Sequence, residues 1–245
     1  MCGRFVSSNT PDKIASYFGA TFDTDPLGDN FNVAPTNDVY AVVADREAQP
    51  VVRAFHWGLV PTWAKEIKIG SKMINARAET VAEKPAFKGL LRSKRLIVPM
   101  DGFYEWKAVP GQKVKQPFFI HRRDGEPLAA AGLWTVWRDT AEGPDAPWLH
   151  SCTIITTSAN ATMAPVHDRM PVFLPPSAWA EWLDPDQHDL EALQRLLVPA
   201  PDDLLEMHPV STAVNSVRNK GPELLDAIEV IDADAAGDRL ELSGD

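Results

Sequence analysis

Short apolar runs separated by polar turns dominate the chain. Two of them, at 39–44 and 51–55, are rich in β-branched residues and lie on either side of a polar segment. Such runs favour strands, and two joined by a short turn favour a β-hairpin. Five further strands are predicted, at 95–98, 103–106, 117–121, 133–137 and 149–156, with 99–102 joining the first pair.

Helical periodicity is confined to short segments. A helix is expected from Pro11 to Phe18, because Thr10 is a good N-cap and Gly19 a good terminator. The segment 85–94 has apolar residues at helical spacing and basic residues on its other faces. Further helices are predicted at 177–183 and 189–197, whereas 58–79 is expected to be irregular.

Strands in succession with helices inserted between them predict the fold class. We expect an α+β domain with a curved, mostly antiparallel β-rich core and peripheral helices. The regular alternation of a doubly wound sheet is absent, and no linker is evident. One domain is therefore predicted over residues 2–232. Residues 233–245 are expected to be an acidic, disordered tail.

Charge is distributed unevenly along the 245 residues, whose net charge is −10. Residues 1–50 sum to −4, residues 51–123 to +10 and residues 124–245 to −16. The basic middle block would suit a groove for phosphates. Charge alone favours the simpler interpretation, in which these residues are a solvated face.

Several classes of protein are disfavoured. No apolar run has the length of a membrane span, and the N-terminus is not a secretory signal. Cys2 and Cys152 are too few for a disulfide framework, and the 6 histidines show no zinc-ligand spacing. We expect a cytoplasmic monomer, nucleoid-associated if bacterial, with no metal, no cofactor and no membrane partner. Cys152 is expected to be a small buried apolar residue.

Cys2 is the candidate for covalent chemistry. A small residue at position 2 permits removal of Met1, which would leave an α-amine and a thiol on adjacent carbons. That pair reacts with an aldehyde to give an imine and then a thiazolidine ring. Reference pKa values of about 8 for the amine and about 8.5 for the thiol leave both groups usable near pH 7. Alone, Cys2 is better interpreted as an incidental residue on a loose terminus.

Two polar residues, Asn75 and Arg77, lie two positions apart and would share a face in extended chain. Asn75 offers a donor and an acceptor, which suits it to hold an amine in place. Arg77 suits a bidentate phosphate contact. The alternative is a surface loop.

Glu105 and His167 are candidate acid–base residues. Glu105 lies between two aromatic residues, and burial would keep it protonated and make it a proton donor. An outward-facing strand carboxylate is the more common case. His167 would exchange protons near neutral pH, and Arg169 would meet a phosphate. Alternatively, these residues form a structural turn in which Asp168 binds local backbone amides.

Aromatic residues within the basic block suggest a way to hold a single strand, by stacking on bases while lysines and arginines follow the backbone. Most of the 8 tryptophans are expected in the core. Only Trp63, which follows Pro61 in a predicted loop, is expected to be a surface ring.

These motifs occur in a characteristic order. The chain contains MCGR at its start, then WGLVPTWA, INARAET, DGFYEW, HDRMP and VSTAVNSVRNKGPEL. Together they resemble the SOS response-associated peptidase (SRAP) family over nearly the whole chain except the acidic tail. The resemblance implies the fold of that family, with a positively charged DNA channel. It also implies covalent capture of abasic sites in single-stranded DNA.

The resemblance implies roles for individual residues. Cys2 would form the crosslink, Asn75 would orient its amine, and Glu105 and His167 would transfer protons. The residues expected to contact DNA are Arg4, Trp63, Arg77 and Arg169. An imine at the sugar can also undergo β-elimination, so abasic-site lyase activity is a further expectation.

Two rival functions remain open. Cys2 with His167 as its base would resemble the dyad of a cysteine peptidase, and self-removal of an N-terminal segment is conceivable. A non-covalent module for single-stranded DNA would use the basic block and the aromatic rings without needing Cys2.

Overall fold

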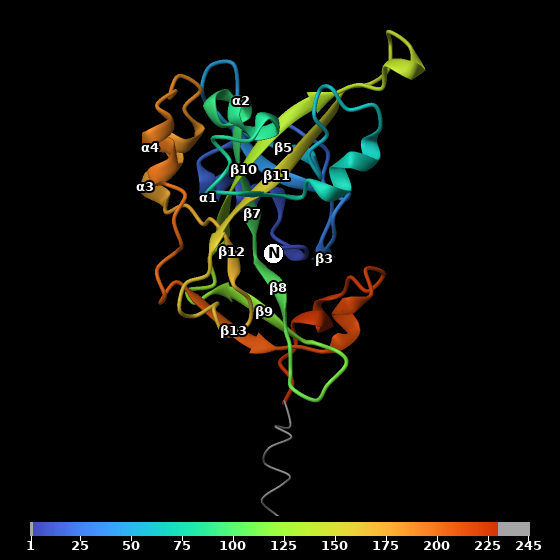
Figure 1. Ribbon diagram of the computed structural model, residues 1–245, viewed down its shortest axis with the longest axis vertical. Coiled ribbons are helices and arrows are strands. Elements are labelled where there is room, and N and C mark those ends of the chain that lie inside the picture. Colours follow the sequence, from blue (N-terminus) through green and yellow to red (C-terminus); the bar gives the residue numbers. More distant parts are fainter. Residues whose placement is uncertain (1, 230–245) are drawn as a thin grey trace, which may run out of the picture.

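Two β-sheets form the core of the computed structural model, which describes residues 2–229 (Figure 1). The larger sheet contains eight strands in the described part of the chain. They are β2 (Thr21–Phe22), β4 (Asp38–Ala44), β5 (Pro50–Trp57), β6 (Asn75–Arg77), β7 (Arg95–Met100), β10 (Leu128–Trp137), β11 (Leu149–Ser158) and β12 (Arg169–Pro171).

The larger sheet closes on itself. Strands β11, β10, β7, β4 and β5 are neighbours in that order, and β5 then pairs in parallel with β11, with Cys152 opposite Trp57. The predicted hairpin is confirmed as β4 and β5. Because β5 pairs with β11, neither strand has an open edge at this point. Phe55, Trp57 and Cys152 belong to the apolar cluster inside the barrel.

The smaller sheet is antiparallel throughout and lies below the barrel in Figure 1. Its strands are β1 (Phe5–Ser7), β3 (Asn30–Val33), β8 (Gly102–Lys107), β9 (Gln116–Arg122) and β13 (Leu205–Pro209). The N-terminal strand β1 lies between β3 and β8, so the first residues of the chain are held by partners on both sides.

One residue carries the chain from the barrel to the smaller sheet. We expected strands 95–98 and 103–106 to be joined through 99–102, but β7 continues to Met100 and β8 begins at Gly102. They belong to different sheets, which local sequence does not reveal. Between them the Asp101 carboxylate accepts hydrogen bonds from the Ser8 amide at 2.6 Å and the Ser8 hydroxyl at 2.7 Å, which fixes the corner beside β1.

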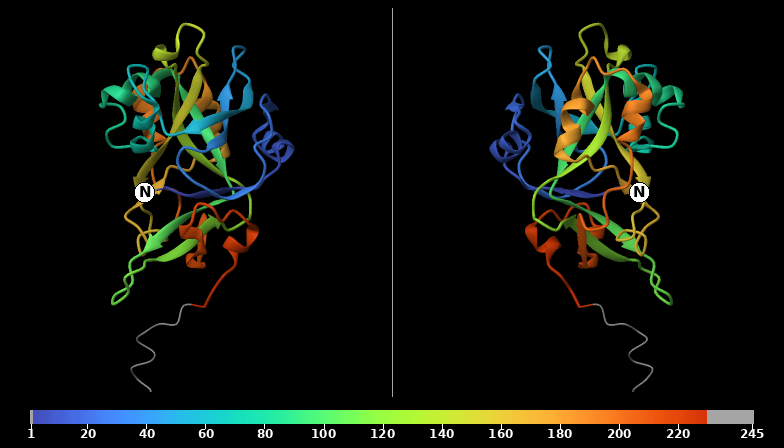
Figure 2. Two further views of the ribbon diagram at one scale, coloured as in Figure 1. Left: turned by 90° about the vertical axis from the view of Figure 1, so that its right-hand side faces the viewer. Right: turned by 90° about the vertical axis from the view of Figure 1, so that its left-hand side faces the viewer.

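The α-helices lie on the outside of the barrel, whereas the 3₁₀ helices η3 (Thr212–Asn215) and η4 (Pro222–Leu225) lie beside the smaller sheet (Figure 2). The α-helices are α1 (Pro11–Phe18), α2 (Pro85–Ser93), α3 (Pro176–Leu183) and α4 (Leu190–Arg195), and further 3₁₀ helices are η1 (Ile67–Lys72) and η2 (Thr140–Glu142). The predicted caps of α1 are confirmed: the Thr10 hydroxyl accepts from the Lys13 amide, and Gly19 adopts φ of 60°.

The predicted α+β class with a mostly antiparallel β-rich core is confirmed. Several short strands were missed, and β10 starts at Leu128, five residues before the predicted strand at 133. The first residues of β10 are alanine-rich. Glycine is needed at position 132, because a Cβ there would lie 2.7 Å from the Thr153 carbonyl oxygen. The tail predicted at 233–245 lies outside the described residues, as do residues 230–232 of the predicted domain.

Candidate active site

Cys2 is fully buried, in the same apolar cluster as Cys152. Its carbonyl oxygen accepts a hydrogen bond of 2.7 Å from Asn75 Nδ2. Burial raises the pKa of the Cys2 thiol well above its ordinary value, and the negative charge of Glu105 raises it further. The interpretation of Cys2 as an incidental residue on a loose terminus is therefore wrong, and the reference pKa of the thiol does not apply at this site, because a low-dielectric environment penalises the thiolate.

Asn75 reaches Cys2 because β6 pairs in parallel with β11, with Asn75 opposite Ile154. The expectation that 58–79 is irregular was wrong, because the segment contains η1 and β6, whose pairing with β11 no local pattern reveals, and Arg77 at the end of β6 is exposed. The Asn75 Oδ1 atom is buried and has no hydrogen-bond partner among the residues that the structure describes. A buried amide oxygen without a donor is costly, so this atom is a ready acceptor for an N–H group.

Glu105 lies on β8, opposite Phe118 of β9, and is 3% exposed. The inward-facing orientation is therefore the correct one. Its influence on the Cys2 thiol shows that the carboxyl and the thiol share one buried environment. The next residue, Trp106, is only partly buried, and its indole Nε1 donates to Asn215 Oδ1 at 2.7 Å. β8 thus presents Glu105 to the interior and Trp106 to the C-terminal segment.

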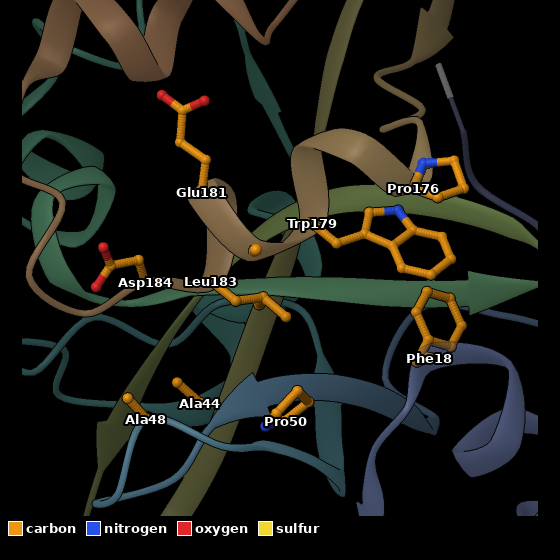
Figure 3. Close-up of a pocket in the computed structure, with 10 residues that line it drawn as sticks. Phe18, Ala44, Ala48, Pro50, Pro176, Trp179, Glu181, Leu183 and Asp184 are labelled. Carbon is orange, nitrogen blue, oxygen red and sulfur yellow. The ribbon is translucent and has the colours of Figure 1, made fainter.

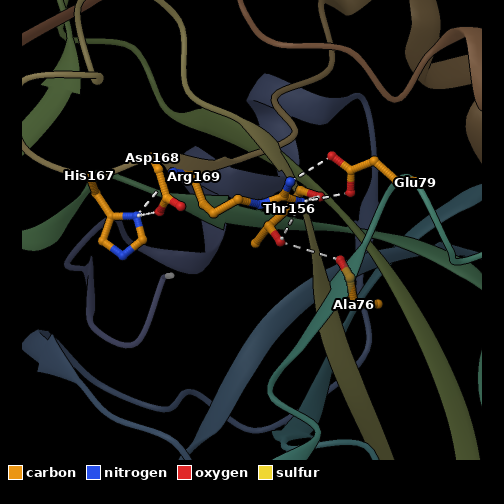
Figure 4. A network of polar contacts seen from close by, with 6 residues as sticks. All are labelled: Ala76, Glu79, Thr156, His167, Asp168 and Arg169. Atoms are coloured by element: carbon orange, nitrogen blue, oxygen red, sulfur yellow. Dashed lines mark hydrogen bonds and ion pairs between the residues drawn. The ribbon is translucent and has the colours of Figure 1, made fainter.

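His167 is oriented by its neighbours in sequence (Figure 4). The Arg169 amide donates to His167 Nδ1 at 3.0 Å, and Asp168 Oδ1 lies 2.9 Å from the same nitrogen. When the ring is neutral, Nδ1 accepts and Nε2 carries the hydrogen. In the alternative interpretation, Asp168 would bind local amides, but here the His167 imidazole accepts the Arg169 amide.

Two of the three predicted DNA-binding arginines are engaged within the protein. The Arg169 guanidinium forms a bidentate pair with Glu79, at 2.6 and 2.9 Å, and donates to the Thr156 carbonyl at 2.7 Å (Figure 4). The bond from Arg169 holds the pKa of Glu79 below its usual value. Arg4 donates to Asn32 Oδ1 and to the Val214 carbonyl, both at 2.9 Å. If Arg4 or Arg169 is to contact DNA, its hydrogen bonds within the protein must be replaced by bonds to phosphate.

Trp63 is a surface ring as predicted, with 65% of its area exposed, but it is not the single exposed tryptophan that we expected, because Trp148 is 57% exposed. Trp63 borders a hollow of about 480 Å³ to which Lys65, Lys68 and Lys72 contribute. On its other side, a smaller hollow of about 140 Å³ is shared with α2. At least part of the basic block therefore lines a concave surface beside an exposed aromatic ring.

This loop is anchored by two glycines. A Cβ on Gly58 would lie 2.8 Å from the Gly70 carbonyl oxygen, and a Cβ on Gly70 would lie 2.5 Å from the Gly58 carbonyl oxygen. The two backbones are therefore in direct contact, which only glycine permits at both positions. The contact holds η1 against the end of β5.

Asn32, which accepts a hydrogen bond from Arg4, is a residue that the sequence patterns did not single out. It is fully buried, and its Nδ2 lies within hydrogen-bonding distance of the carbonyls of Val214, Ser216 and Asn219, at 2.9–3.1 Å. The VSTAVNSVRNK motif contributes these carbonyls, so the motif was the available signal. A lone asparagine in a short strand gives no other indication.

Within residues 2–229, no group of three or more His, Cys, Asp or Glu side chains is placed to hold a metal ion.

The model of one protein family, described as SOS response associated peptidase (SRAP), matches residues 1–217. The chain belongs to the SRAP family. Curated relatives include abasic site processing protein YoaM of Bacillus subtilis, 43% identical, with 93% of this chain and 98% of that protein covered. Abasic site processing protein YedK of Escherichia coli is 35% identical, over 93% of this SRAP chain and the whole of the relative.

Solved structures show the same fold. A protein from Bacteroides thetaiotaomicron superposes with a TM-score of 0.82 at 24% identity, covering 93% of this SRAP chain and 100% of that chain. A phage-related protein from Bordetella bronchiseptica superposes with a TM-score of 0.67 at 30% identity, covering 85% of this chain and 94% of that chain. Separately, no helix within residues 2–229 has the length and apolar character required to cross a membrane.

Proposed function

We propose that this SRAP protein captures abasic sites in single-stranded DNA covalently, through a thiazolidine formed by the amine and thiol of Cys2. The observation that carries the proposal is the buried position of Cys2. Its carbonyl is hydrogen-bonded to Asn75, and the charge of Glu105 acts on its thiol. Relatives named as abasic site processing proteins cover nearly the whole chain and support it.

The proposed reaction begins with the open-chain form of the abasic sugar, which carries an aldehyde at C1′. After Met1 has been removed, the Cys2 amine adds to C1′, and loss of water gives an imine. The orphan Oδ1 of Asn75 is suited to accept an N–H of that amine and to aim its lone pair at C1′. In this arrangement, Asn75 binds Cys2 at both the Cys2 carbonyl and the Cys2 amine.

Ring closure forms the C1′–S bond and moves the thiol proton to the imine nitrogen, so no atoms are lost. Because burial keeps the thiol protonated, this step needs a group that relays the proton from sulfur to nitrogen, and we assign that relay to the Glu105 carboxyl. His167 is suited to relay to the departing hydroxyl the proton that the Cys2 amine releases when it adds to C1′, so that the imidazole ends unchanged. Single Glu105→Gln and His167→Ala variants should therefore form and reverse the adduct more slowly.

The raised pKa of the Cys2 thiol bears on the rival functions. A cysteine peptidase needs a thiolate nucleophile at neutral pH, and this site opposes thiolate formation. Trp63 and its neighbouring lysines suit non-covalent binding of single-stranded DNA, which we include as the first step of capture. The imine alone can cleave the strand by β-elimination, so residual lyase activity is expected when the thiol is absent.

The test uses protein whose Met1 is shown by mass to be absent and a single-stranded oligonucleotide with one abasic site. We expect a heat-stable band on a denaturing gel, with the mass of protein plus DNA minus one water. Cys2→Ala should lose this adduct, while Cys152→Ala, which removes the other buried thiol, should keep it. A heat-stable adduct from Cys2→Ala, or none from the wild type, would overturn the proposal.

A further inference from the structure

A groove of about 660 Å³ lies between α3 and the tip of the β4–β5 hairpin (Figure 3). Its surface is mostly apolar, with Phe18, Trp179, Leu183 and Pro50 among the residues that line it. In Figure 1, α1 and α3 lie on the left of the barrel, whereas the turquoise segment that carries Trp63 and η1 lies on the right. The groove is therefore separate from the surface proposed for DNA.

The aromatic floor of this groove is already fixed in place. The Trp179 ring packs on Phe18 and Tyr17, with centroids 4.5 and 5.4 Å apart, and its Nε1 donates to the Leu174 carbonyl at 3.1 Å. A ring held on several sides presents its remaining area without a further loss of conformational freedom on binding. Rigid aromatic residues in a concave site are the usual centres of binding energy between proteins.

The opposite wall is also rigid. At the hairpin tip, Asp45 Oδ1 accepts hydrogen bonds from the Glu47 amide at 2.9 Å and the Gln49 amide at 2.8 Å. This turn holds the backbone around Ala48, which lines the groove. The groove is thus bounded by a closed turn on one side and by a helix on the other. It does not depend on a partner for its shape.

Charge indicates the chemistry of the occupant. The charged residues that line the groove are both acidic, Glu181 and Asp184, and both are exposed. In Figure 3 they lie towards the left, while Trp179 and Phe18 lie towards the right. Neither carboxylate lies within ion-pair distance of a basic side chain of the described chain, although Arg95, which donates to the Asp184 carbonyl, partly offsets the charge of Asp184. This arrangement repels phosphate and attracts a lysine or arginine next to an apolar side chain.

We infer that the groove docks a peptide segment of another protein, with an apolar anchor against Phe18 and Trp179 and a basic residue near Glu181 and Asp184. The acidic lining excludes nucleic acid as the occupant. Because the groove and the DNA surface lie on different sides of the barrel, the docked partner and DNA can be bound together. The inference is independent of the chemistry proposed for Cys2.

The test uses fluorescein-labelled amphipathic peptides of leucine and lysine, with a second series in which glutamate replaces every lysine. Fluorescence anisotropy should show saturable binding of the leucine–lysine peptide that weakens with salt, and binding of the glutamate series weaker by at least about tenfold. The variant Ala180→Arg fills the groove from an exposed position of α3 and should weaken binding by about tenfold or more.

A charge-matched pair of variants separates the groove from the overall acidity of the chain. Glu181→Lys/Asp184→Lys should weaken binding by about tenfold, whereas Glu142→Lys/Asp145→Lys, with the same change of charge on an exposed loop, should change it by less than about twofold. Equal weakening by both pairs would overturn the inference, as would equal binding of both peptide series or no saturable binding. Self-association lost in Ala180→Arg would also overturn it, because the occupant would then be a second copy.

Discussion

At the scale of single residues, the environment of Cys2 decides its chemistry. A cysteine at position 2 is expected to be exposed, yet this one is fully buried and bonded through its carbonyl to Asn75. In the reaction that we propose, the same burial that raises the pKa of the thiol would shelter the imine from water and favour ring closure over hydrolysis. Asn75 is the residue whose removal tests this arrangement most directly.

We expect Asn75→Ala to slow formation of the abasic-site adduct by about tenfold. The change removes a 2.7 Å hydrogen bond to Cys2, and such a bond contributes roughly 1–1.5 kcal/mol. The measurement is the single-turnover rate at saturating abasic DNA. Thr153→Val is the control, because the Thr153 hydroxyl is buried without a partner, and it should leave the rate unchanged. A wild-type rate for Asn75→Ala would show that Asn75 does not position Cys2.

The buried thiols also predict how stability depends on pH. Burial raises the pKa values of Cys2 and Cys152 above their ordinary value of 9.0. The unfolded chain therefore ionises first, and stability that is complete below about pH 9 falls as the pH rises further. Tyr104 acts in the same direction, because its pKa is also raised by burial.

We therefore expect the melting temperature of the wild type to fall between pH 8 and pH 10. The variant Cys2→Ala/Cys152→Ala should melt lower at pH 8, because it has cavities, but should lose less on going to pH 10. Thermal unfolding followed by circular dichroism at the two pH values checks this. An equal fall in both proteins would mean that the thiols are not the cause.

At the scale of elements, β11 organises one side of the site. It pairs with β6, which carries Asn75, and with β12, which begins at Arg169. The pair between Arg169 and Glu79 ties β12 to the turn that follows β6. On the other side, Asn32 of β3 binds the segment after β13 and the guanidinium of Arg4, next to β1.

We predict that Asn32→Ala lowers the free energy of unfolding by about 2–4 kcal/mol. The substitution removes the side-chain donor of the Ser216 and Asn219 carbonyls and one acceptor of Arg4, whereas the Val214 carbonyl keeps its bond from Arg4. Urea unfolding measures the loss. Asn219→Ala provides the comparison, because its side chain makes an exposed bond to the Ala213 carbonyl and should cost less than about 1 kcal/mol. Similar losses in both variants would show that Asn32 is not a clamp.

At the scale of the whole molecule, a net charge of −10 coexists with a local basic surface. Lysines of η1 meet Trp63 at one hollow, and α2 meets the same ring at another. Arg77 is exposed at the end of β6, whereas Arg4 is bonded within the protein. These placements distinguish arginines that can meet phosphates directly from those that stabilise the fold.

Salt dependence of DNA binding tests that distinction. For single-stranded DNA without an abasic site, Arg77→Ala should reduce the slope of log K against log salt by about 0.7, the value for one phosphate contact. Arg4→Ala should leave the slope unchanged, even if it weakens the protein. Fluorescence anisotropy titrations over a range of salt concentrations provide both slopes. Equal reductions would place Arg4 on DNA and contradict its bonding within the protein.

The sequence by itself determined those features that depend on neighbouring residues. The β4–β5 hairpin, the caps of α1 and the exposed Trp63 follow from local patterns, because turns, caps and short apolar runs act over a few positions. The ordered motifs indicated the SRAP family, which the family model confirmed. The motifs also named the candidate site residues, whose roles stay predictions, but they did not reveal the surroundings of those residues.

Only the tertiary structure decided what depends on residues distant in sequence. Parallel pairing of Cys152 with Trp57 closes the barrel, and no local pattern encodes a contact across some 95 positions. The burial of Cys2, the partner of Arg169 and the role of Asn32 likewise arise from strands brought together by the fold. The physical reason is that burial and hydrogen bonding reflect the whole packed core, whereas propensity reflects the residue and its immediate neighbours.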